Sequence, residues 1–414
     1  MNKRSSHVNS QHSKAFTETL ALENKYCAKN YAPLPVVLVR GEGIYVWDQE
    51  DKKYIDMMSA YSAVSHGHQH PRLLKALHKQ STTLCVVSRA YYTDNLGPFL
   101  KLACDLTNMD RALPMNTGVE AVETALKAAR KWAYEVKGVT PDKAEIISCA
   151  GNFHGRTISI VAFSSEPQYR YGFGPYSTGF KQIPYADSDA LEQAITANTA
   201  AFLVEPIQGE GGIIIPPEGY LRRCAEICKK HNVLLICDEV QTGLGRTGKF
   251  LASQYDHVQP DGLILGKALG GGILPVSLFL ARQDVMDVFS PGDHGSTFGG
   301  NPLACAVAHE ALQVLLDEDL VQKSRELGDY FQQQLADIQS PLIKEVRGRG
   351  LLIGVEFHAH KIKAREVCEK LLQYGILSKE THDTVARFAP PLIINRQQID
   401  QAIEKIRKTI HSLE

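Results

Sequence analysis

DGLILGK, residues 261–267, is a short apolar run that ends in Lys267. A second apolar run, VLLIC at residues 233–237, is followed directly by Asp238. Short apolar runs that end on a charged residue are typical of the buried parallel strands of an α/β sheet. Because ligands bind such sheets at the carboxyl ends of the strands, we expect Asp238 and Lys267 to point into one site.

An acid and an amine at neighbouring strand ends have two interpretations. They could form a structural ion pair. They also suit pyridoxal phosphate (PLP), because a lysine can form a Schiff base with this cofactor and a carboxylate can keep its pyridinium nitrogen protonated. The spacing alone leaves both interpretations open.

The composition predicts an ordinary globular enzyme. The chain has 414 residues, 44% hydrophobic and 22% charged, which is long enough for two domains. The net charge of -1 gives no basic footprint for nucleic acid, and no apolar run approaches the roughly 18 residues of a membrane helix. Nine cysteines without a C-x-x-C pair favour reduced, mostly buried thiols and a cytoplasmic location. Residues 1–13 are polar and are expected to form a disordered tail.

HGHQHP at residues 66–71 places three histidines at alternate positions, a spacing that could hold zinc on a strand. No cysteine or carboxylate close by in the sequence completes a ligand set, so we expect no metal. Pro71 is expected to open a helix over residues 72–80, because proline suits a first helical position.

Two further motifs allow both ligand-binding and purely structural interpretations. Thr117 and Glu120 are spaced as a capping box, and the helix N-terminus that they predict could bind phosphate or could simply be well capped. Phe153 and Arg156 follow a predicted strand at residues 146–149. They could stack on a ligand ring and bind a carboxylate, or they could only pack.

GLGRTG at residues 243–248 formally matches the dinucleotide fingerprint. Residues 238–242 separate it from the preceding strand, and no long helical period follows. The fingerprint requires strand, glycines and helix in direct succession. A nicotinamide-dependent dehydrogenase is therefore not favoured.

Taken together, the motifs resemble those of the class III aminotransferases, which have fold type I. The motifs that carry the resemblance are NTGVEA at 116–121, FHGR at 153–156, DEVQTG at 238–243, Lys267 and STFG at 296–299. The resemblance extends from about residue 15 to the C-terminus. It implies an α/β fold with a large domain on a mostly parallel seven-stranded sheet and a smaller α+β domain. The expected division is an N-terminal small-domain segment at 14–56, the large PLP-binding domain at 57–305 and the C-terminal small domain at 306–414.

The resemblance implies that PLP is the cofactor and that Lys267 binds it covalently and moves the reacting proton. Asp238 would pair with the pyridinium nitrogen. Gln241 would bond the phenolic oxygen, and Glu205 would lie near Gln241.

The same resemblance implies residues for the cofactor ring and phosphate. Phe153 and Val240 would enclose the ring, and Thr117, Gly118 and Val119 would lie at the phosphate. Further phosphate contacts would come from the neighbouring subunit of a homodimer, through Ser296 and Thr297.

Residues 30–37, 59–64 and 88–92 resemble those of the ornithine-specific members of the class, which use L-ornithine and 2-oxoglutarate as substrates. The product, glutamate 5-semialdehyde, would cyclise to pyrroline-5-carboxylate and link arginine, proline and glutamate metabolism. N-acetylornithine and 4-aminobutyrate are alternative donors. A PLP-binding protein without catalysis is a different alternative, but its mark would be the loss of Lys267, Asp238 or Arg156, and none is missing.

The resemblance also implies substrate-binding residues. Arg156 would bind the α-carboxylate of ornithine, with Tyr31 near the α-amino group and Tyr61 lining the pocket. Arg387 would bind one carboxylate of 2-oxoglutarate. Glu210 would pair with Arg387 while ornithine is bound.

Overall fold

The computed structural model describes residues 14–414, and its largest β-sheet has seven strands within that range. The strand order is β4-β10-β9-β8-β7-β5-β6, and all strands run in one direction except β10. The predicted mostly parallel seven-stranded α/β sheet is confirmed. The strands are β4 Arg111–Met115, β5 Glu145–Cys149, β6 Phe180–Ile183, β7 Thr199–Val204, β8 Leu234–Asp238, β9 Gly262–Leu265 and β10 Ser277–Ala281.

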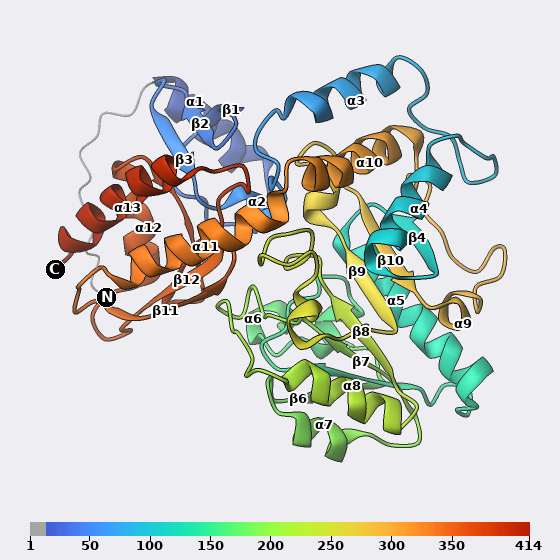
Figure 1. Cartoon of the computed structure of the whole chain (residues 1–414). Coiled ribbons are helices and arrows are strands. Elements are labelled where there is room, and N and C mark those ends of the chain that lie inside the picture. The colour runs from blue at the N-terminus through green and yellow to red at the C-terminus, as the bar shows by residue number, and fades with distance from the viewer. Residues whose placement is uncertain (1–13) are drawn as a thin grey trace.

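Helices lie before, between and after these strands in the chain, and some of them cover the two faces of the sheet (Figure 1). They are α3 Pro71–Ser81, α4 Leu96–Thr107, α5 Gly118–Trp132, α6 Pro167–Arg170, α7 Ser188–Ala194, α8 Tyr220–Lys230, α9 Gln283–Met286 and α10 Pro302–Asp317.

Each face of the large sheet has its own apolar core. Leu234 and Ile236 cluster with residues of α5, whereas Leu235 and Cys237 cluster with residues of α8 on the other face. Side chains of a strand alternate between the two faces. Both alternating sets must therefore be apolar, which explains the uninterrupted run that the sequence shows.

Both ends of the chain contribute to a second sheet, ordered β1-β2-β3-β13, in which β13 pairs in parallel with β3. A third, antiparallel sheet has the order β11-β12-β15-β14. Figure 1 shows the blue N-terminal strands beside the orange and red C-terminal elements. The division of the chain at residues 56 and 305 stays a prediction. The strands are β1 Leu38–Glu42, β2 Tyr45–Asp48, β3 Lys53–Asp56, β11 Ile343–Arg349, β12 Leu352–Phe357, β13 Ile376–Leu377, β14 Lys379–Thr381 and β15 Val385–Phe388, and the helices are α1 Lys14–Tyr26, α2 Ser59–Ser62, α11 Leu320–Ala336, α12 Ala364–Gln373 and α13 Arg396–His411.

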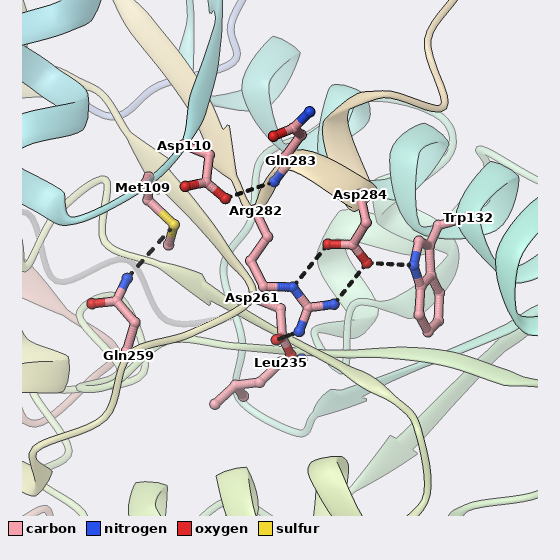
Figure 2. A network of polar contacts seen from close by, with 9 residues as sticks. All are labelled: Met109, Asp110, Trp132, Leu235, Gln259, Asp261, Arg282, Gln283 and Asp284. Atoms are coloured by element: carbon pink, nitrogen blue, oxygen red, sulfur yellow. Dashed lines mark hydrogen bonds and ion pairs between the residues drawn. The ribbon is translucent and has the colours of Figure 1, made fainter.

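A network of polar contacts lies at the end of the large sheet where β8 and β9 begin (Figure 2). Arg282 follows β10, forms an ion pair with Asp261 and donates two hydrogen bonds to Asp284 at 3.0 and 2.9 Å. Asp261 in turn accepts a 2.8 Å bond from the backbone N–H of Leu235, and Asp284 accepts one of 3.2 Å from Trp132. The network links the N-terminal ends of β8 and β9, whereas the functional site lies at their C-terminal ends.

The structure separates the three alternating histidines. Their polar partners are, in order, the carbonyl of Ala311, the carboxylate of Asp56 and the carboxylate of Glu318. Residues 14–414 contain no group of histidine, cysteine and acidic side chains that could hold a metal ion. The helix expected after His70 is confirmed as α3, with Pro71 in its first turn.

The remaining sequence expectations have mixed outcomes. The GLGRTG segment forms turns and is followed by a short 3₁₀ turn, Ala252–Asp256, in place of the helix that a dinucleotide site requires. Within the described part of the chain, no helix is long and apolar enough to cross a membrane. The predicted disordered tail at residues 1–13 lies outside the described residues.

Candidate active site

A cavity of about 280 Å³ lies where β5, β7, β8 and β9 end. It is lined by many of the residues that the sequence singled out: Gly118, Val119, Phe153, Arg156, Glu205, Glu210, Asp238, Val240, Gln241 and Lys267. Sequence reasoning assigned no role to the other lining residues, which are Val122, His154, Gly155, Ile207 and Thr242. The carboxyl ends of the strands thus bring the predicted acid and amine into one site.

Asp238 is the last residue of β8, and its carboxylate contacts the ring of His154. Its Oδ2 lies 2.7 Å from Nδ1 of His154, and its Oδ1 accepts a 3.1 Å bond from the backbone N–H of Val240. Burial alone would lower the pKa of His154, but the hydrogen bond to Asp238 and the charges of Asp238 and Glu205 outweigh burial and raise it. The contact with His154 thus fixes the position of the Asp238 carboxylate. The only sequence signal for His154 was its place in the FHGR motif.

Glu205 directly follows β7 and fixes the backbone that carries Phe153. Its carboxylate accepts bonds from the N–H of Phe153 at 3.0 Å and from the N–H of Gly209 at 3.4 Å. Burial raises the pKa of Glu205 to about 7, with His154 opposing and Asp238 reinforcing the shift. Glu205 therefore positions the aromatic ring through its backbone.

Lys267 lies two residues beyond β9 and lines the cavity. Burial lowers its pKa, against the opposing charge of Glu210 and with the help of Arg387. An amine with a lowered pKa is neutral, and therefore nucleophilic, at a lower pH than an exposed lysine.

The N-terminus of α5 lies on another side of the cavity. Thr117 and Glu120 form the predicted capping box, in which the Glu120 carboxylate accepts a 2.6 Å bond from the N–H of Thr117. Gly118 and Val119 begin the helix and line the cavity. A Cβ at position 118 would lie 3.0 Å from the side chain of Val240, so glycine allows this close approach. The first N–H groups of a helix favour a phosphate.

The chemistry of these groups suits a cofactor with an aldehyde, a ring nitrogen and a phosphate. The amine of Lys267, the carboxylate of Asp238 and the start of α5 offer one partner to each. The buried Oε1 of Gln241 also has no hydrogen-bond partner among residues 14–414. A polar ligand atom would satisfy it.

Glu210, which lines the cavity, forms an ion pair with the buried Arg387. Nη1 of Arg387 donates a 2.8 Å bond to Oε1 of Glu210, which also accepts a 3.2 Å bond from Gln241. Burial alone would raise the pKa of Glu210, but the charge and hydrogen bond of Arg387 outweigh it and lower the pKa to about 2. Arg387 is 1% exposed, and its guanidinium lies 5.2 Å from the ring of Tyr61. Within residues 14–414, its Nε and Nη2 have no hydrogen-bond partner.

Arg156 is in the opposite situation. Its guanidinium lies 3.9 Å from the centre of the Tyr169 ring, and no carboxylate of the described residues forms an ion pair with it. Arg156 also lines an adjoining cavity of about 280 Å³ together with Tyr31. The site therefore holds one guanidinium that is neutralised and one that is open to a carboxylate.

The structure does not bring Ser296 and Thr297 to the cavity wall. Thr297 is exposed, Phe298 is 54% exposed, and the hydroxyl of Ser296 accepts a 2.8 Å bond from Asn116. Thr117 caps α5 without lining the cavity. The cofactor roles of these residues stay predictions.

Comparison with known proteins places the chain in a family. The model of the family "Aminotransferase class-III" matches residues 26–410. Ornithine aminotransferase 2 of Staphylococcus aureus (strain N315) is 59% identical over 388 residues, covering 94% of this chain and 97% of that protein. A solved structure of ornithine aminotransferase from Toxoplasma gondii has a TM-score of 0.95 and 48% identity, covering 96% of this chain and 94% of the other. That of acetylornithine aminotransferase from Elizabethkingia anophelis has a TM-score of 0.87 and 47% identity, covering 96% and 99%. The chain therefore belongs to the class III aminotransferases.

Proposed function

We propose that this chain is a PLP-dependent L-ornithine δ-aminotransferase. It would move the δ-amino group of L-ornithine to 2-oxoglutarate, giving glutamate 5-semialdehyde and glutamate. The observation that carries the proposal is the contrast between two arginines: Arg387 is buried against Glu210, whereas Arg156 has no carboxylate partner among residues 14–414. The names of the similar enzymes from Staphylococcus aureus and Toxoplasma gondii support the same activity.

Different residues of the cavity would bind different parts of the cofactor. PLP, when bound, accepts the electrons of the reacting carbon. Lys267 would hold it and move the proton at the substrate carbon. Asp238, backed by His154, would keep the ring nitrogen protonated, and the first turn of α5 would bind the phosphate. Gln241 would contact the phenolic oxygen.

The two arginines explain how one site could accept both substrates. Arg156 would bind the only carboxylate of ornithine, because Glu210 neutralises Arg387. That orientation directs the δ-amino group towards Lys267. 2-Oxoglutarate has two carboxylates, so it would occupy Arg156 and displace Glu210 from Arg387. A site that binds a diamine monocarboxylate and a dicarboxylate in turn needs one permanent and one switchable clamp.

A homodimer is part of the proposal. Thr297 and the half-exposed Phe298 lie outside the cavity of their own chain, so they are free to reach the phosphate site of a second copy. The exposed Tyr91 and Tyr92 give the chain further apolar surface for such an interface.

The test is an absorbance spectrum of the purified protein before and after L-ornithine is added. We expect a yellow band that ornithine bleaches, and pyrroline-5-carboxylate that can be trapped chemically. A second candidate donor is N-acetylornithine, favoured by the similarity to the Elizabethkingia anophelis enzyme. A band that ornithine leaves unchanged but that N-acetylornithine or 4-aminobutyrate bleaches would reject ornithine as the donor. No band after PLP is added would reject the cofactor.

A further inference from the structure

We infer that Arg246 is a positioning residue for the pocket that binds the second carboxylate of 2-oxoglutarate. Its buried guanidinium joins the segments that carry Tyr61 and Arg387 to the loop that follows Asp238. The inference rests on the proposed function, because it concerns how the acceptor is bound.

The guanidinium of Arg246 bonds three separate segments of the chain. Nη1 donates to the carbonyls of Pro390 at 2.6 Å and Leu351 at 3.0 Å, and Nη2 donates to the hydroxyl of Ser65 at 2.8 Å. Arg246 is 1% exposed, and no carboxylate of the described residues forms an ion pair with it. Its planar set of donors, in addition to its charge, therefore holds these segments together.

Two of the three partners lie next to pocket residues. Pro390 comes three residues after Arg387, and its carbonyl is fixed by Arg246. Ser65 comes four residues after Tyr61, and its carbonyl accepts a 2.8 Å bond from the N–H of Leu392. Arg246 thus holds together the two segments whose side chains meet where the Arg387 guanidinium lies over the Tyr61 ring.

The segment before Ser65 needs this support because its backbone is strained. All four residues of α2, Ser59–Ser62, have positive φ, and that of Tyr61 is 59°. Left-handed backbone is unfavourable for non-glycine residues and persists only where the surroundings hold it. The carboxylate of Asp56 binds two N–H groups at the start of the turn, at 2.9 and 2.8 Å. Arg246 holds its far end through Ser65.

Arg156, which would bind the carboxylate of ornithine, is not held by these contacts. Arg156 lies on the loop after β5, and none of the hydrogen bonds of the Arg246 side chain reaches that loop. A change at Arg246 should therefore alter the reaction with 2-oxoglutarate much more than the reaction with ornithine.

The experiment compares the holoenzymes of wild type, Arg246→Lys and Ser65→Ala. A lysine keeps the charge but offers one donor nitrogen in place of the two that bond these acceptors, and alanine removes one acceptor. In a ping-pong reaction each kcat/KM reports only its own half-reaction. We expect the ratio of kcat/KM for 2-oxoglutarate to that for ornithine to fall about tenfold in Arg246→Lys and about threefold in Ser65→Ala. Calorimetry with glutarate, which has two carboxylates and no keto group, should show a parallel loss of affinity.

Ser148→Ala is the matched control. Ser148 is a fully buried serine on β5 with one long hydroxyl bond of 3.5 Å, and its loss should leave the ratio unchanged. A merely structural role of Arg246 would reduce the active fraction, lower both kcat/KM values equally and preserve the ratio. An unchanged ratio in folded Arg246→Lys, or in Ser65→Ala if the first variant does not fold, would overturn the inference. Failure of the wild-type protein to react with ornithine or 2-oxoglutarate would instead reject the proposed function.

Discussion

Glu210→Gln tests the switch between the two substrates. Glutamine keeps the shape of the side chain and removes the charge that neutralises Arg387 at 2.8 Å. Burial alone would raise the pKa of Glu210, but Arg387, with smaller contributions from Lys267 and Gln241, lowers it from its usual 4.5 to about 2; the difference corresponds to roughly 3 kcal/mol at about 1.4 kcal/mol per tenfold. A quarter of the Glu210 side chain is exposed, at 25%, so solvent screening reduces the interaction to about 1–3 kcal/mol.

The variant should change the two half-reactions in opposite directions. In the wild type, 2-oxoglutarate must displace Glu210 from Arg387, so loss of the charge should raise kcat/KM for 2-oxoglutarate about tenfold, or about 1.4 kcal/mol. Ornithine would then find both Arg156 and Arg387 without a carboxylate partner from the protein. Its carboxylate would bind Arg387 in part of the complexes and turn the α-amino group towards Lys267. We expect kcat/KM for δ-amino transfer to fall at least about tenfold for the same energy.

The assay measures each kcat/KM and separates the products of δ- and α-amino transfer by mass spectrometry after chemical trapping. Glu310→Gln is the control, because it removes an ion pair with Arg72 at 2.6 Å on α10, away from the cavity. That variant should change neither value. A Glu210→Gln enzyme with wild-type donor and acceptor kinetics would refute the assignment of Glu210 as the partner that 2-oxoglutarate displaces.

Further predictions concern the amine, the histidine, the subunits and pH. Lys267→Ala should lose all detectable turnover with an unchanged circular dichroism spectrum, and an active variant would reject its role. In equilibrium dialysis, His154→Phe should lower the affinity of the apo-protein for PLP about tenfold, because Asp238 loses a charge-assisted hydrogen bond. His154→Asn should lower this affinity less. Equal PLP affinities of wild type and the His154→Phe variant would contradict the role of His154. When Lys267→Ala chains are mixed with Thr297→Glu chains, half of the dimers should be hybrids, and each hybrid has one intact site out of two. The mixture should therefore regain about a quarter of wild-type activity. No recovery would place Thr297 in the site of its own chain. Because the pKa of Glu210 is lowered in the folded protein, ionised Glu210 stabilises the fold above about pH 4.5, and this stabilisation is lost as the pH falls towards 2. Urea denaturation should therefore show a steeper loss of the free energy of unfolding in this pH range for wild type than for Glu210→Gln.

The sequence was sufficient where the physical cause is local. The apolar runs at 233–237 and 261–267 predicted β8 and β9, because a strand buried on both faces must be apolar at every position. The capping box at Thr117 was readable because its two partners lie within one helical turn. The order of the motifs indicated the family.

Apart from the pair of Glu210 and Arg387, which the family resemblance had implied, the tertiary structure alone decided which distant side chains meet. Arg387 and Glu210 are 177 residues apart, and His154 and Asp238 are 84 apart. No spacing rule connects such pairs, so the backing of Asp238 by His154 and the contacts of Arg246 were invisible in the sequence. A single chain also leaves Ser296 and Thr297 outside the cavity that their motif suggested.

Glu205 and Glu210 show why residue type was not enough. They are five residues apart, yet burial raises the pKa of Glu205 to about 7, whereas burial is outweighed at Glu210 by the charge of Arg387 and its pKa falls to about 2. The sequence determined that both are glutamates near a strand end. Their protonation depends on which charges packing places beside them, because desolvation and charge act over distances that only the folded chain sets.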